Sequence, residues 1–244
     1  MTVLEKVPIL GVDFAKITNH ELLESLKKDL LAKNTRFIVT ANPEIVLYAR
    51  KHPAYAKVIQ QADYITADGI GIIIGSRILQ RPLPERVTGF DTMKQLLATA
   101  EKLQKSVYFL GAKADVLQAA LKTVKKNYPH LIIAGARDGY FDQEVPIAKA
   151  IQQTKPDIIL VALGFPKQET FIQKYYQDTP AIWMGVGGSF DVLAGKVKRA
   201  PLFWQKHHIE WLYRLIQEPT RLPRMMALPK YLLLVLAEKF HLIK

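Results

Sequence analysis

The stretch IILVALGFPKQE, residues 158–169, places a continuous apolar run directly before a turn rich in polar residues. An apolar run without alternation is typical of a strand buried on both faces of a parallel sheet, so we predict a strand over 158–164. Five other short segments share this pattern, and most of them stop at a glycine or a polar residue. They are residues 36–40, 63–66, 107–111, 131–135 and 182–187.

Helical patterns separate these predicted strands. Thr18 and Glu21 have the spacing of a capping box, and Pro43 suits the first turn of a later helix. Strands that alternate with helices favour parallel pairing through right-handed crossovers. We therefore expect an α/β fold with a Rossmann-like, mostly parallel sheet flanked by helices.

The pattern changes after Phe190, where no further strand is predicted. The chain carries a formal net charge of +12, and residues 196–244 hold ten basic and three acidic side chains among helical stripes of Leu and Trp. We predict an α/β core over residues 1–195 and a basic, helical, membrane-associating appendage over residues 196–244 that completes the site. A basic module of this kind favours an anionic partner, although a merely solvated face stays open as an alternative.

Several classes of protein are excluded by composition. The chain has no cysteine, which rules out a disulfide scaffold, a zinc finger, an iron–sulfur site and a thiol nucleophile. Its first residues carry charges where a secretory leader would be apolar, and no run reaches the ~18–20 apolar residues of a membrane span. We expect a cytoplasmic protein.

Ligands of an open parallel sheet bind beyond the carboxyl ends of its strands. Asp68 follows a predicted strand among apolar and glycine neighbours, with no Lys or Arg within five residues on either side. Such surroundings raise the pKa of a carboxylate and suit a general base. The alternative is that Asp68 is the N-cap of the next helix, and spacing alone does not decide between the two.

The common phosphate motifs are absent. In GVGGSF, Phe190 stands where the dinucleotide fingerprint has its third glycine, and no Walker A pattern occurs. No Asp-x-Asp pair is present to hold a divalent metal on a diphosphate. His207 and His208 are adjacent and do not share a helix face, so we interpret them as aromatic or interface residues. A bound diphosphate would then be neutralised by Arg, Lys and backbone N–H groups.

Seven motifs follow one another along nearly the whole chain, and the tripeptide RAP at 199–201 comes after the last of them. They are TANPE (40–44), ADG (67–69), RVTGFD (86–91), FLGAK (109–113), DGYF (138–141), LGFPKQE (163–169) and GVGGSFD (185–191). Together they resemble the WecG/TagA/CpsF family of bacterial glycosyltransferases, and within it the members of teichoic-acid synthesis.

The resemblance implies an inverting transfer of N-acetylmannosamine from its UDP donor to the 4-hydroxyl of N-acetylglucosamine on undecaprenyl diphosphate, without a metal or cofactor. It implies that Asp68 is the catalytic base. The substrate-binding residues predicted from the motifs and the tail are Thr40, Asn42, Gln168, Arg86, Gly111, Lys113, Gly139, Tyr140, Asp191, Arg214, Arg221 and Arg224. The UDP phosphates are expected near the FLGAK and DGYF turns. The tail is expected to bind the inner, anionic face of the cell membrane peripherally.

Other functions stay open. A donor such as N-acetylmannosaminuronic acid would need an extra cation, for which Lys113, Arg137 and Lys167 are candidates. A nucleic-acid-binding protein would also be basic, but the charge clusters with Leu and Trp in the tail, so no nucleic-acid partner is expected. A nicotinamide oxidoreductase is disfavoured by the broken fingerprint. The sequence leaves open whether the chain forms a homo-oligomer.

Overall fold

The computed structural model describes residues 4–197, 200–201, 203–204, 210–217 and 222–243, apart from the side chains of Arg214 and Pro223. Its core is one six-stranded sheet, and every neighbouring pair of strands is parallel. The strand order is β4-β3-β8-β7-β5-β6. The strands are β3 (Arg36–Ala41), β4 (Tyr64–Ala67), β5 (Ser106–Gly111), β6 (Ile132–Arg137), β7 (Ile158–Ala162) and β8 (Ile182–Gly185). The predicted α/β fold with a parallel sheet is confirmed.

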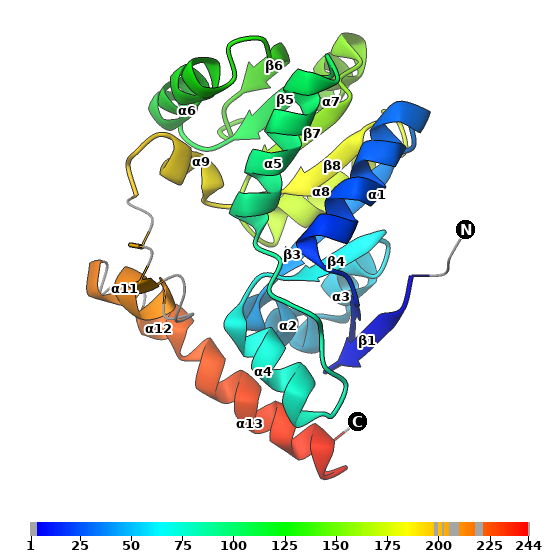
Figure 1. The fold of residues 1–244 in the computed structure, drawn as a ribbon, viewed down its shortest axis with the longest axis vertical. Helices are drawn as coiled ribbons and strands as arrows, with labels where there is room; N and C mark the ends of the chain where they lie inside the picture. Colours follow the sequence, from blue (N-terminus) through cyan, green and yellow to red (C-terminus); the bar gives the residue numbers. More distant parts are fainter. Residues whose placement is uncertain (1–3, 198–199, 202, 205–209, 218–221, 244) are drawn as a thin grey trace.

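Helices cover both faces of this sheet (Figure 1). They are α1 (Asn19–Ala32), α2 (Pro43–Lys51), α3 (Pro53–Ile59), α4 (Ile70–Ile78), α5 (Gly89–Lys102), α6 (Ala114–Asn127), α7 (Glu144–Thr154), α8 (Lys167–Tyr175) and α9 (Ser189–Leu193). The C-terminal part adds α11 (Glu210–Gln217), α12 (Leu222–Met225) and α13 (Ala227–Lys239). The predicted capping box is present at Thr18 and Glu21, and Pro43 is the first residue of α2.

The apolar core has two halves because successive residues of a strand point to opposite faces of the sheet. In β7, Ile159 and Val161 belong to one buried cluster, and Ile158 and Leu160 belong to the other. All four side chains are fully buried. The continuous apolar run at 158–162 therefore indicates a strand that is buried on both faces of the sheet, as expected for an inner parallel strand.

An N-terminal hairpin is present that was not predicted from the sequence. Strand β1 (Lys6–Ile9) pairs antiparallel with β2 (Val12–Ala15). Leu10 and Gly11 join them with φ angles of 50° and 80°, as a tight hairpin turn requires. The signal was the alternation in β1, where Val7 and Ile9 are buried and Lys6 and Pro8 are exposed. This alternation differs from the continuous runs on which the other strands were recognised.

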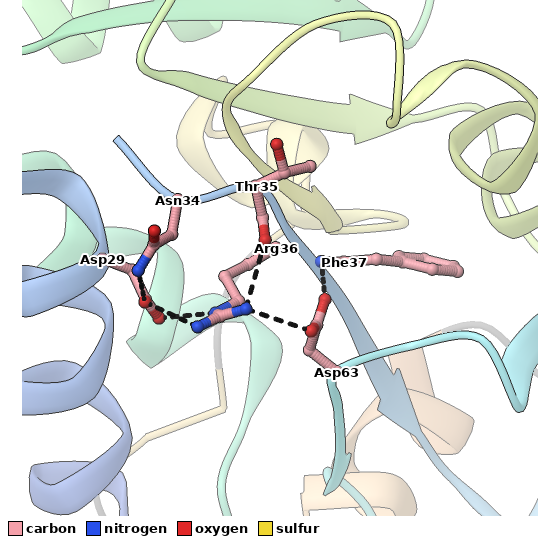
Figure 2. A network of polar contacts seen from close by, with 6 residues as sticks. All are labelled: Asp29, Asn34, Thr35, Arg36, Phe37 and Asp63. Carbon is pink, nitrogen blue, oxygen red and sulfur yellow. Dashed lines mark hydrogen bonds and ion pairs between the residues drawn. The ribbon is translucent and has the colours of Figure 1, made fainter. Parts of the chain in front are cut away.

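A polar network holds the amino ends of two strands and the end of α1 together (Figure 2). Arg36 Nε and Nη2 donate to the two carboxylate oxygens of Asp29 at 2.8 and 2.9 Å. Arg36 Nη1 donates to Asp63, which in turn accepts the Phe37 backbone N–H at 2.8 Å. This network lies at the edge of the sheet opposite the carboxyl ends, which remain available for a ligand.

The C-terminal helix packs against the body. Helix α13 lies along α2 and α4 (Figure 1), and Tyr231 and Val235 are fully buried in the larger of the two core clusters. Glu238, near the end of α13, accepts the backbone N–H of Leu10 at 2.8 Å. Leu233 on the same helix is 68% exposed, so only one side of α13 is covered by the body. Among the described helices, none combines the length and the apolar character that a membrane span requires.

Candidate active site

A cavity of about 670 Å³ opens at the carboxyl ends of β3, β4, β8 and β7. Segments of the C-terminal part, including Trp211 of α11 and Arg224 of α12, complete its wall. Seven of the residues predicted from the sequence line this cavity. They are Thr40, Asn42, Asp68, Arg86, Gln168, Asp191 and Arg224. Residues separated by as many as 184 positions in the chain thus meet at one edge of the sheet.

Four other predicted residues lie outside the described lining of the cavity. Gly111 is the last residue of β5, and Lys113, Gly139 and Tyr140 lie in the turns after β5 and β6. Gly139 packs against the backbone of Gly111 and Ala112, so these two turns lie next to each other. Arg214 lies in α11, and Arg221, His207 and His208 lie outside the described residues. The roles of all these residues stay predictions.

Asp68 stands directly after β4 and is partly buried. Its backbone N–H donates to the carbonyl of Ala41 at 3.0 Å, which ties the end of β4 to the end of β3. The N-cap of α4 is Gly69, which has no side chain to cap the helix. The interpretation of Asp68 as the N-cap residue is therefore wrong. Asp68 lines the cavity instead.

Gly69 explains how the loops after β3 and β4 come so close. A Cβ atom at this position would lie 2.8 Å from Pro43 Cδ and 3.4 Å from Asn42 Cβ. Only glycine fits without moving the start of α2. The turn that carries Asp68 therefore packs directly on the turn that carries Asn42.

Asn42 and Thr40 are held by local contacts. Asn42 is the N-cap of α2, and its side-chain oxygen accepts the Ile45 backbone N–H at 3.0 Å. Thr40 Oγ1 donates to the carbonyl of Gly185 at 3.5 Å. A Cβ atom at Gly89 would lie 2.9 Å from Thr40 Oγ1, so the start of α5 closes over this hydroxyl. Both side chains are thereby presented in defined orientations.

Among the described residues, two ion pairs connect the C-terminal helices to the body at the cavity. Arg86 Nη2 lies 2.6 Å from Glu210 Oε2, and the two side chains are only 14% and 13% exposed. Arg224 Nε lies 3.1 Å from Glu44 Oε1 in a more open position. Neither Glu44 nor Glu210 was predicted as a site residue. Glu210 could have been noticed as one of only three acidic residues in the basic tail.

A buried acid lies behind the cavity wall. Glu169 follows Gln168 in the first turn of α8 and is 1% exposed. Burial among apolar side chains raises the pKa of its carboxyl group. Burial, and then the neighbouring Glu169, raise the pKa of Tyr55 as well. Neither Glu169 Oε2 nor Tyr55 Oη has a partner in regular hydrogen-bond geometry, although the two groups lie close enough to affect each other.

Replacing Glu169 by glutamine is expected to stabilise the protein by an amount that grows with pH. Because the folded state raises the pKa above 4.5, it holds the proton more tightly than the unfolded chain does. The stability that this proton contributes is complete below the unfolded pKa and is lost as pH rises through the raised folded pKa. Glutamine does not titrate. Thermal denaturation of Glu169→Gln and wild type from about pH 5 to about pH 9 measures the difference, and a difference that does not change with pH contradicts the prediction.

Within the described part of the chain, no three His, Asp or Glu side chains are grouped as they would be around a metal ion.

The cavity therefore combines one carboxylate at a strand end, polar side chains from three strand ends and arginines from the body and the tail. These features define an α/β protein with a ligand site beyond the carboxyl ends of a parallel sheet. The model of the glycosyl transferase WecG/TagA/CpsF family matches residues 7–244. The chain belongs to this family and is a glycosyltransferase, as its motifs predict.

Curated relatives are similar over most of their length. The chain is 41% identical over 235 residues to a protein of Bacillus spizizenii strain W23, covering 96% of the chain and 91% of the relative. It is 43% identical over 203 residues to a protein of Bacillus subtilis strain 168, covering 83% and 79%. A Staphylococcus aureus strain MW2 protein is 41% identical over 231 residues, covering 93% and 91%. All three relatives are named N-acetylglucosaminyldiphosphoundecaprenol N-acetyl-beta-D-mannosaminyltransferase.

Proposed function

We propose that this protein transfers N-acetylmannosamine from UDP-N-acetylmannosamine to the 4-hydroxyl of N-acetylglucosaminyl-diphospho-undecaprenol, in the synthesis of the wall teichoic acid linkage unit. The names of the relatives support the transferred sugar, N-acetylmannosamine, and the lipid-linked acceptor. The observation that carries the proposal is the meeting of Asp68 with Thr40, Asn42, Gln168 and two arginines in one cavity. The cavity volume of about 670 Å³ falls within the range of small-molecule sites, ~300–1,000 Å³.

Asp68 is the proposed general base. An inverting transfer is a single displacement in which the acceptor oxygen attacks the anomeric carbon from the face opposite the leaving group. Asp68 takes the proton of the acceptor hydroxyl as the new C–O bond forms, and the bond between the anomeric carbon and the UDP oxygen breaks with its electrons. UDP leaves as an anion. One base and one stabilised leaving group are sufficient for this reaction.

The arginines are the proposed partners of the diphosphates. Guanidinium groups bind phosphate oxygens through charge-assisted hydrogen bonds, which are the stronger kind in proteins. In the structure Arg86 and Arg224 pair with Glu210 and Glu44. We propose that a bound diphosphate exchanges places with these carboxylates, and that Arg214 and Arg221 add to the same charge. Gly111, Lys113, Gly139, Tyr140 and Asp191 stay proposed substrate-binding residues.

We further propose that residues 1–195 act as the catalytic core, and that residues 196–244 attach the protein to the inner, cytoplasmic face of the membrane. Large apolar side chains that are exposed in the described C-terminal part support this proposal. Among them are Trp211, Ile216, Leu222, Met226, Leu233, Leu236, Phe240 and Leu242. Apolar side chains combined with a basic surface favour binding to anionic lipid. Whether the chain forms a homo-oligomer is a separate question, which a measurement of its oligomeric state in solution answers.

The proposed function is tested by incubating the pure protein with a panel of UDP-sugars and a short-chain diphosphate-lipid acceptor. We expect product only with UDP-N-acetylmannosamine, identified by mass, and equal rates with and without EDTA. Product from UDP-N-acetylmannosaminuronic acid or another UDP-sugar instead would assign a different donor. Loss of activity in EDTA, restored by a divalent cation, would refute the metal-free mechanism.

A further inference from the structure

Gln168, in the cavity wall, is held by the buried acid Glu169. Its Nε2 donates to Glu169 Oε1 at 2.7 Å, and its Oε1 accepts the Gly187 backbone N–H at 3.0 Å. Both Gln168 and Glu169 are almost completely buried, at 5% and 1% exposed. The amide is therefore held at both ends, with its donor toward the acid and its acceptor toward the loop after β8.

The surroundings leave the amide little freedom. A Cβ atom at Gly185 would lie 2.9 Å from Gln168 Nε2, so the amide packs flat on the end of β8. The loop that it holds, Gly187 and Gly188, also lines the cavity. Rotation of the amide by 180° would place its N–H₂ group against the Gly187 N–H and break both hydrogen bonds. The acceptor oxygen of Glu169 selects the observed orientation.

Glu169 is not part of the described cavity lining, which includes its neighbour Gln168. A buried carboxyl group with one unpartnered oxygen costs stability, and an apolar residue of similar size would avoid this cost. Incompletely satisfied buried polar groups next to a ligand site are a recognised sign of a functional constraint. Glu169 lies in the first turn of α8, where an acid interacts favourably with the helix dipole. This interaction does not explain why the acid is buried, since an exposed acid would interact with the dipole equally well.

We propose that Glu169 is a positioning residue, which acts through Gln168 by fixing the orientation of its amide and thereby the Gly187–Gly188 loop against the substrate. Tyr55, on α3, interacts with the same carboxyl group. The expected effect of Glu169 variants on turnover rests on the proposed function. Their expected effect on the environment of the Gly187 N–H does not depend on that function.

The experiment compares four variants of the full-length chain. In Glu169→Leu the acceptor is lost, and kcat/KM is expected to fall about tenfold, as for the loss of one to two hydrogen bonds, while the thermal midpoint does not fall. In Glu169→Gln an acceptor oxygen is retained, and kcat/KM is expected within about twofold of wild type. Gln168→Ala and the double variant Gln168→Ala/Glu169→Leu are expected to be equally impaired, because a residue that acts only through Gln168 adds nothing once Gln168 is gone.

Three results would each overturn the proposal. The first is a double variant whose losses are the sum of the two single losses, and the second is wild-type kcat/KM in Glu169→Leu. The third is a Glu169→Gln variant that is as impaired as Gln168→Ala. The Glu169→Gln comparison remains decisive if the leucine variant does not fold. A parallel loss of thermal stability and activity in Glu169→Leu would indicate a purely structural role.

A second measurement separates this proposal from the proposed function. The chain has 13 glycines, so ¹⁵N-glycine labelling gives a simple spectrum in which Gly187 is assigned by its loss in Gly187→Ala. Its N–H resonance is expected to shift in Glu169→Leu and in Gln168→Ala, and to stay in place in Glu169→Gln. An unshifted Gly187 resonance in Glu169→Leu overturns the positioning role even if the protein uses a different sugar donor.

Discussion

Replacing Asp68 by asparagine is expected to lower kcat about 100- to 10,000-fold, the usual contribution of a general base. Asparagine has nearly the same shape and keeps the contacts of the β4–α4 turn, which depend on the backbone N–H of residue 68 and on Gly69. The negative charge of the side chain and its ability to take a proton are lost. Steady-state kinetics with the lipid acceptor measure the effect.

UDP binding provides the control for this prediction. Calorimetric titration of Asp68→Asn with UDP is expected to give a Kd close to that of wild type, because the base acts on the acceptor rather than on the nucleotide. Asp142→Asn, at an exposed aspartate outside the cavity lining, is the matched variant for the loss of one negative charge and should retain turnover. Wild-type turnover in Asp68→Asn would remove Asp68 from the role of base.

Replacing Tyr231 by alanine is expected to detach α13 from the body. Tyr231 is fully buried, and its ring lies on α4 where a Cβ atom at Gly75 would come within 3.1 Å of two ring carbons. Loss of a large buried aromatic side chain costs about 3–5 kcal/mol. Because α13 continues from α12, which carries Arg224, activity on the lipid acceptor should fall together with the hydrogen-exchange protection of α13.

Tyr231→Phe is the matched control. The Tyr231 hydroxyl has no hydrogen-bond partner, and burial raises its pKa. Its removal is therefore expected to leave stability and activity unchanged or slightly increased, since an unsatisfied buried hydroxyl costs about 1–3 kcal/mol. If α13 keeps its protection in Tyr231→Ala, other contacts, such as the one between Glu238 and Leu10, hold the helix.

The sequence predicts the parallel sheet well because the information is local. Continuous apolar runs such as the one at 158–162 identify strands buried on both faces, and a capping box or a proline marks the start of a helix. The position of Asp68 after a strand is likewise readable from the chain alone. The β1–β2 hairpin was missed because its residues alternate, and short alternating segments resemble loops as much as strands.

The order of the strands is not local information. The neighbours β4, β3, β8 and β7 bring their carboxyl ends to one cavity, while β5 and β6 lie toward the other side of the sheet. For this reason Thr40, Asp68 and Gln168 meet, and the turns at Lys113 and Tyr140 fall outside the described lining. No spacing in the sequence distinguishes these two groups of turns.

The class of fold, the family and the carboxylate at the end of β4 can be predicted from the chain alone, because they depend on short patterns of apolar, glycine and polar residues. The pairing of arginines with acids, and the side chains behind the cavity wall, become known only from the folded structure. Arg86 and Glu210 are 124 positions apart, and Arg224 and Glu44 are 180 apart. The burial of Glu169 likewise depends on the packing of α3 against α8. Such contacts depend on how distant segments pack, and no local pattern records them.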